Sequence, residues 1–180
     1  MSTITVIYGG NNKESRLMGL YEKIIKAFGN HGKKVESIFV ADLPADDLIS
    51  ANYLSTAIQV ANEKVRKADI VVVLTPVYKA SYSGILKTYL DLLPQKALVH
   101  KAVIPVAIGG TFGHLLAIDY AIKPVLSALG ATTIFTGAFV IDQDIKRTNV
   151  GFELPKEIDQ RITTEVERAL AVDQLGILTD

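Results

Sequence analysis

The residues best placed for chemistry follow a buried, strand-like run. The segment TPVYKASYSGILKTYLDLL, residues 75–93, comes directly after the apolar residues 70–74 and turns through proline, tyrosine, serine and glycine into an apolar helix. A loop at the carboxyl end of a strand lies where open α/β sheets bind their ligands. Its residues do no acid–base or nucleophilic chemistry at neutral pH unaided, so we predict that a bound cofactor supplies the reactive atoms.

A second candidate loop, GGNNKESR at residues 9–16, opens onto a predicted helix. Backbone N–H groups at a helix N-terminus form a cradle for phosphate, to which Ser15 adds a hydroxyl and Arg16 or Lys13 a positive charge. A plain strand-to-helix turn, with Asn and Gly chosen for backbone reasons, explains the loop equally well. The loop has no G-x-G-x-x-G, no G-K-[ST], and no acidic pair of the kind a phospho-acceptor receiver needs.

The loop PVYKASYSG suits a flat heteroaromatic ring. Backbone groups of Val77 and Tyr78 are expected at the ring edge, with hydroxyls from Ser81 and Ser83 as further donors and Lys79 as a candidate contact to phosphate or adenine. The alternative for Tyr78 is half-buried surface packing, which is common for tyrosine.

The third loop, GGTFGH at residues 109–114, allows close backbone approach at Gly109 and Gly110. His114 is more typical of a capping or packing residue than of a catalyst. The other two histidines lie in separate segments, so no metal site is predicted.

Strand-like and helix-like segments alternate along the whole chain. This pattern predicts an α/β fold: a flavodoxin-like three-layer sandwich in which a five-stranded parallel sheet of order 2-1-3-4-5 is covered by helices on both faces. Its cleft lies at the carboxyl ends of the first, third and fourth strands, where the three loops are found. We expect one domain over residues 1–180, with strands at 3–8, 35–40, 70–74, 102–108 and 132–140.

Composition excludes several classes of partner. Nineteen basic and nineteen acidic side chains cancel, which argues against nucleic-acid or anionic-membrane binding and mildly favours self-association. There is no cysteine, so disulfides, thiolate nucleophiles and sulfur-ligated metals are excluded. The N-terminus resembles a first strand and not a signal peptide, and no apolar run approaches the roughly twenty residues that span a bilayer. A cytoplasmic protein is expected.

The blocks TPVYKASYSGILKTYLDLLP and GGTFGHLLAIDYAIKPVLSALGA resemble the NADPH-dependent FMN reductases of two-component alkanesulfonate monooxygenase systems. The resemblance is dense from about residue 69 to 140. It implies that NADPH passes a hydride to FMN and that reduced FMN leaves for a partner flavin-dependent monooxygenase. In the first loop the family pattern G-S-x-R followed by serines is matched at Gly9 and Ser15 only, which implies fewer side-chain phosphate contacts and weak or altered FMN binding.

The resemblance also assigns cofactor-binding residues. It places Gly9, Ser15 and Arg16 near the flavin phosphate. The residues expected near the ring and its edge are Pro76, Val77, Tyr78, Lys79, Ser83, Gly109, Gly110 and Thr111.

Pro124 lies inside a helical pattern over residues 114–129, where it cannot donate a hydrogen bond to the carbonyl of Tyr120. A kink or a π-bulge absorbs such a proline. In the resembling family a tyrosine at the position of Tyr120 marks a π-helix at a tetramer interface. The alternative is a simple kink with Tyr120 packed in the core.

A homodimer or homotetramer is predicted from the helix at residues 85–93, which is apolar around nearly all of its circumference. Coverage of its second side by the C-terminal segment of the same chain is the competing explanation. Two rival functions stay open: an enzyme with tightly held FMN that reduces quinones, azo dyes or metal oxyanions, and a flavodoxin-like electron carrier, which the zero net charge disfavours.

Overall fold

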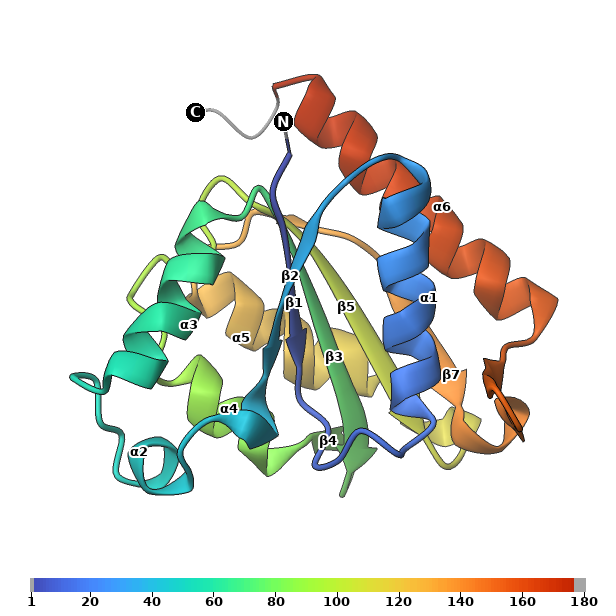
Figure 1. Cartoon of the computed structure of the whole chain (residues 1–180), viewed down its shortest axis with the longest axis horizontal. Helices are drawn as coiled ribbons and strands as arrows, with labels where there is room; N and C mark the ends of the chain where they lie inside the picture. The colour runs from blue at the N-terminus through green and yellow to red at the C-terminus, as the bar shows by residue number, and fades with distance from the viewer. Residues whose placement is uncertain (1, 177–180) are drawn as a thin grey trace.

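The computed structural model describes residues 2–176 and places the predicted strands in one parallel sheet (Figure 1). The strands are β1 (Ile4–Tyr8), β2 (Val35–Phe39), β3 (Ile70–Tyr78), β4 (Ser81–Tyr82), β5 (Ala102–Gly109), β6 (Thr133–Ile134), β7 (Ala138–Ile141), β8 (Lys146–Thr148) and β9 (Gly151–Glu153). The longer helices are α1 (Leu17–Asn30), α3 (Thr56–Lys67) and α6 (Lys156–Gln174). The shorter ones are η1 (Val40–Asp42), α2 (Ala45–Ile49), α4 (Gly84–Leu90), η2 (Phe112–His114), η3 (Ile118–Ile122), α5 (Lys123–Ala128) and η4 (Asp142–Asp144).

The flavodoxin-like order is confirmed for the parallel strands, which run β2-β1-β3-β5-β6. The expected count of five is wrong, because the main sheet has seven strands. Strand β4 pairs antiparallel with an extension of β3, and the fifth parallel position is divided between β6 and β7, which both pair with β5. The sheet therefore keeps the predicted topology with an added hairpin and a broken edge strand.

Two apolar layers hold the sandwich together. Helices α1 and α6 cover one face of the sheet, and α3, α4 and α5 cover the other (Figure 1). Strand residues alternate between the layers: Ile4, Val6 and Tyr8 of β1 pack toward α1 and α6, while Ile7 packs toward the opposite layer. This period-2 alternation fixes which loop emerges beside which, because a one-residue slip would exchange the two cores.

Helix α4 does not need a second subunit to cover it. Leu86, Tyr89 and Leu90 are buried within the single chain, and η1 and α2 lie against this helix. The C-terminal helix α6 is on the other face of the sheet, so coverage of α4 by the C-terminal segment is wrong. The residues that cover it come from 40–49, which follow β2.

Two elements expected to be continuous are broken. The predicted strand at 132–140 is interrupted between Ile134 and Ala138. The predicted helix at 114–129 consists of the 3-10 turn η2, the π-helix η3 and the short α-helix α5. Pro124 lies in the first turn of α5, where a proline is tolerated, and the π turn η3 directly before it confirms the expected π-bulge.

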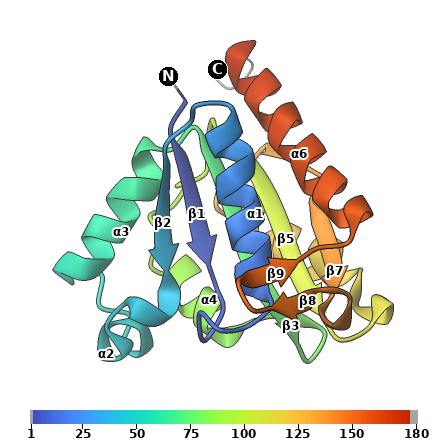
Figure 2. The same ribbon diagram turned by 45° about the vertical axis from the view of Figure 1, so that its right-hand side comes forward.

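A two-stranded antiparallel sheet, β8–β9, was not predicted from the sequence. It lies across the N-terminal end of α1 (Figure 2). Gly19 of α1 makes this packing possible, since a Cβ atom there would lie 2.6 Å from the Cβ atom of Phe152.

Candidate functional site

The three predicted loops meet at the carboxyl edge of the sheet. The parallel register pairs Tyr8 with Leu74 and Pro76 with Ile108, so the ends of β1, β3 and β5 lie side by side. A buried hydrogen bond joins the first loop to the second, with the hydroxyl of Ser83 donating to the carbonyl of Gly9 at 2.6 Å. The topology thus brings together the segments in which the sequence placed a cofactor.

Gly9 and Ser83 build this junction and have no polar group left for a ligand. The N–H of Gly9 donates to the carbonyl of Leu74 at 2.7 Å, and a Cβ atom at Gly9 would lie 2.8 Å from the Cβ atom of Leu86. The Ser83 hydroxyl also accepts from the N–H of Leu86 at 3.2 Å and so caps α4. Both residues position the loops from below.

The first loop contains N–H groups that have no hydrogen-bond acceptor. From Gly10 to Arg16, only the N–H of Glu14 has an acceptor among the described residues, the side-chain oxygen of Asn12 at 3.0 Å. The loop is exposed from Asn11 to Glu14 and leads directly into α1. Successive free N–H groups before a helix N-terminus carry partial positive charge and suit a phosphate group.

Tyr8 supports the loop from below, a role that sequence reasoning missed. Its side chain is fully buried, and its hydroxyl donates to the carbonyl of Asn12 at 3.0 Å and contacts the Ser15 hydroxyl at 3.1 Å. Burial raises the pKa of Tyr8, so the phenol keeps its proton at neutral pH. The signal in the sequence was a lone tyrosine closing an apolar strand before two glycines.

Both cations of the first loop are already paired. Arg16 binds the Asp142 carboxylate at 2.8 Å, and its Nε donates to the carbonyl of Ile145 at 2.8 Å. Lys13 binds Asp42 and lies 4.4 Å from the centre of the Phe39 ring. The expectation that Arg16 lends its charge to a phosphate therefore changes: its side chain holds the loop against the chain that follows β7.

The second loop is a tight hairpin. Val77 pairs with Tyr82 and Tyr78 with Ser81, which leaves Lys79 and Ala80 at the turn with φ of 50° and 63°. Pro76 and Val77 are half-buried and Tyr78 is exposed. The Thr75 hydroxyl accepts from the N–H of Ser83 at 3.0 Å and so fixes the base of the hairpin.

Replacing Ala80 by glycine should stabilise the protein. A positive φ destabilises an L-residue by about 1–2 kcal/mol, and glycine removes this strain. Glycine also gives the unfolded chain more conformational entropy, which offsets about half of the gain. We therefore expect the free energy of unfolding to rise by about 0.5–1 kcal/mol. Urea unfolding of the variant beside wild type measures it. A lower unfolding midpoint would show that the methyl group of Ala80 makes a contact that outweighs the strain.

The third loop begins at Gly109, the last residue of β5. A Cβ atom there would lie 2.8 Å from the Phe139 ring, whereas one on Gly110 would meet nothing within 4 Å. Gly110 and Thr111 are exposed, and Thr111 is the N-cap residue of η2. Within the described chain the buried Nδ1 atom of His114 has no hydrogen-bond partner. A side chain at position 109 would thus clash with Phe139, whereas Gly110 has open space beside it.

The π-helix η3 adjoins the second loop, because it contacts β4. Tyr120 lies in this π turn with 78% of its surface exposed. A simple kink with Tyr120 in the core is therefore wrong. Phe112 and Leu116 are also exposed, so an apolar surface runs from the third loop along η3.

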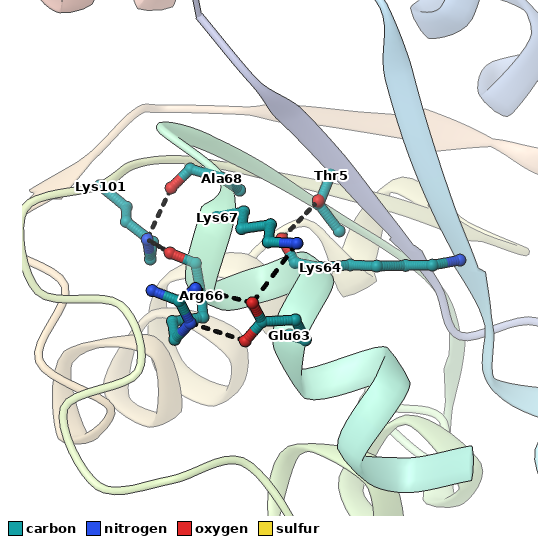
Figure 3. A network of polar contacts seen from close by, with 7 residues as sticks. All are labelled: Thr5, Glu63, Lys64, Arg66, Lys67, Ala68 and Lys101. Atoms are coloured by element: carbon teal, nitrogen blue, oxygen red, sulfur yellow. Dashed lines mark hydrogen bonds and ion pairs between the residues drawn. The ribbon is translucent and has the colours of Figure 1, made fainter. Parts of the chain in front are cut away.

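A network of polar contacts lies at the amino ends of the strands, opposite the three loops (Figure 3). Lys101 donates to the carbonyls of Arg66 and Ala68 at the end of α3, and Thr5 donates to the carbonyl of Lys64 at 3.0 Å. Burial lowers the pKa of Lys101, and the Arg66 side chain lowers the pKa of Glu63 to about 2. Lys101 is thus bound to backbone carbonyls, and Arg66 is paired with the Glu63 carboxylate.

Two cavities of about 730 and 700 Å³ lie away from the three loops, one between α3 and residues 92–101 and one between β7, η3 and α6. No residue of the three loops lines either cavity. We place the site at the loops because of their unbonded N–H groups and their hydroxyls, and not because of a cavity. Within residues 2–176 no group of three or more histidine or acidic side chains is arranged to hold a metal ion. No helix in that range has the length and hydropathy to cross a membrane.

Known proteins are similar to this chain in sequence. The family model described as NADPH-dependent FMN reductase matches residues 2–146. An FMN reductase (NADPH) of Pseudomonas putida is 45% identical over 142 residues, covering 79% of this chain and 72% of the relative. The corresponding protein of Escherichia coli K12 is 47% identical over 122 residues, covering 68% and 64%.

A solved structure extends the likeness to nearly the whole fold. The apo form of the NADH:FMN oxidoreductase EmoB superposes with a TM-score of 0.85 at 28% identity, covering 95% of this chain and 90% of that one. The chain belongs to the NADPH-dependent FMN reductase family.

Proposed function

We propose that this protein transfers a hydride from NADPH to FMN and releases reduced FMN. The observation that carries the proposal is the set of unbonded N–H groups between Gly10 and Arg16, all but that of Glu14, placed beside the β3–β4 hairpin and the third loop in a member of this family. The loops can hold a phosphate at one end and a flat ring at the other.

The protein's own contribution is binding and orientation. Loop N–H groups would hold the phosphate, joined by the Ser15 hydroxyl once its proton turns away from Tyr8. Pro76, Val77, Tyr78 and Gly110 would border the ring, with Lys79, Gly109 and Thr111 at its rim. Bound FMN would supply the hydride acceptor, so no general base is required. Tyr78, Lys79 and Ala80 are exposed, which leaves this side of the site open to the nicotinamide nucleotide.

An open, backbone-based phosphate site favours flavin that exchanges. Both cations of the first loop are paired with carboxylates, which reduces their attraction for a phosphate. Reduced FMN would then leave for a separate flavin-dependent monooxygenase acting on a sulfonate or a related compound.

Self-association is part of the proposal. The exposed side chains of Phe112, Leu116 and Tyr120 form an apolar surface next to the second loop, and such surfaces mark contacts between proteins. We expect a homodimer or homotetramer by sedimentation velocity. A single monomeric species at micromolar concentration would contradict this.

Steady-state oxidation of NADPH by flavin-stripped protein tests the function. A rate that saturates with excess free FMN and continues for many turnovers per subunit is expected. A rate that reaches its plateau at one FMN per subunit and then requires an added quinone would favour a tightly bound flavoenzyme. FMN binding without NADPH oxidation would indicate an electron carrier. NADH assayed in parallel determines the nucleotide preference.

A further inference from the structure

We propose that the segment 142–153 is a clamp on the flavin phosphate loop, and that Arg147 is its positioning residue. The inference rests on the proposed FMN site and adds a residue to it. Arg147 lies in β8, one residue beyond the part of the chain that the family model matches. It is outside the three loops from which the site was predicted.

The clamp and the loop hold each other by reciprocal bonds. Arg16 of the loop donates to the carbonyl of Ile145 and binds Asp142, both in the clamp. Arg147 of the clamp donates from Nη2 to the carbonyl of Glu14 in the loop at 2.6 Å. The loop is therefore fixed on both sides of Ser15.

The bond from Arg147 orients the peptide group that carries the N–H of Ser15. The C=O of residue 14 and the N–H of residue 15 belong to one planar trans peptide and point in opposite directions. When Arg147 holds the Glu14 carbonyl on one side, the Ser15 N–H must face the other side. Arg147 thus acts on a bound phosphate through the peptide, and it need not touch the phosphate itself.

The Arg147 side chain is braced for this role. Its guanidinium lies 5.8 Å from the centre of the Phe152 ring, and the Phe152 side chain packs against Gly19 of α1. Among the described residues Arg147 forms no ion pair with a carboxylate, unlike Lys13 and Arg16. Of Lys13, Arg16 and Arg147, only Arg147 has a charge that no carboxylate among the described residues neutralises.

The decisive measurement compares FMN with riboflavin, which has the same ring and no phosphate. Replacing Arg147 by glutamine should raise the Kd for FMN about tenfold, the loss expected from one hydrogen bond to a charged group. The Kd for riboflavin should stay at its wild-type value. Arg147→Lys keeps a charged donor and should restore most of the FMN affinity, whereas Arg161→Gln, an exposed arginine on α6, serves as the charge-matched control.

Unchanged FMN affinity in Arg147→Gln would overturn the proposal, and so would equal weakening of FMN and riboflavin. Tryptic cleavage after the exposed Lys13, followed by mass spectrometry without flavin, tests the clamp separately. Cleavage should be several-fold faster in Arg147→Gln than in Arg161→Gln or wild type. If wild type binds no flavin, the proposed function fails, and the cleavage rates alone decide whether the clamp exists.

Discussion

Replacing Gly137 by alanine is expected to lower the free energy of unfolding by about 3–5 kcal/mol, a large fraction of the total for one domain. Gly137 has φ of 77°, which costs an L-residue about 1–2 kcal/mol. Its Cβ atom would also lie 2.0 Å from the backbone carbonyl oxygen of Pro105 in the central strand β5. Because backbone in the middle of a sheet cannot move aside cheaply, the clash adds the larger part of the loss.

Urea unfolding of Gly137→Ala and Gly29→Ala measures this effect against a matched control. Gly29 is near the end of α1, and a Cβ atom there would meet nothing within 4 Å. Alanine at that position should raise stability by about 0.5–1 kcal/mol. If Gly137→Ala does not accumulate as soluble protein while Gly29→Ala does, the prediction holds. Equal unfolding midpoints for the two variants would contradict it.

Pro105 explains why Gly137 is in this position. Val103 and Pro105 are two residues apart in β5 and therefore face the same neighbouring strand. The carbonyl of Val103 accepts from the N–H of Phe135 at 2.9 Å, so the N–H that Pro105 lacks would have faced that strand as well. The edge strand bulges at this point and resumes at Ala138 as β7.

The bulge leaves a backbone donor that α6 satisfies. The N–H of Gly137 donates to the buried carboxylate of Glu165 at 2.8 Å, and the second oxygen of that carboxylate accepts from Arg168. A proline in a central strand is thus accommodated by a glycine in the next strand and an acid on a helix. The sequence pattern predicted one strand here because β-branched and apolar residues stand on both sides of the break.

The parts of the fold that depend on periodicity could be predicted from the sequence. The parallel topology follows from alternating strand-like and helix-like segments, and the three loops from glycine and hydroxyl residues at strand ends. The partners of individual polar side chains could not be predicted, because they come from residues distant in the chain. Arg16 meets Asp142 and Ser83 meets Gly9, contacts that no local pattern encodes.

The same limit explains the error over helix α4, whereas the π-helix expected at Tyr120 is confirmed. The mostly apolar surface of α4 shows that the helix is buried, but not that residues 40–49 of the same chain bury it. Pro124 shows that the helix must deviate, but the proline alone does not distinguish a π turn from a kink. Tyr8 was missed because its role depends on a loop folding back over the end of its own strand.

Replacing Ser83 by alanine should weaken the binding of FMN and of riboflavin alike. The Ser83 hydroxyl is fully buried, donates to Gly9 in the first loop and caps α4 behind the second. Alanine removes an N-cap worth about 1 kcal/mol and leaves the buried Gly9 carbonyl without a donor, at a further cost of about 1–3 kcal/mol. The free energy of unfolding should fall by about 2–4 kcal/mol.

Fluorescence titration with both flavins, together with urea unfolding, checks this prediction. Ser127→Ala, at an exposed position on α5, is the control and should change stability by no more than about 0.5 kcal/mol. Ser83 joins the phosphate loop to the ring loop, so its loss should affect a flavin with or without a phosphate. Arg147 holds the phosphate loop alone, so its loss should affect FMN only. If Ser83→Ala spares riboflavin, the two loops do not depend on this bond for their relative position, and the junction at Gly9 would not be what aligns the flavin site.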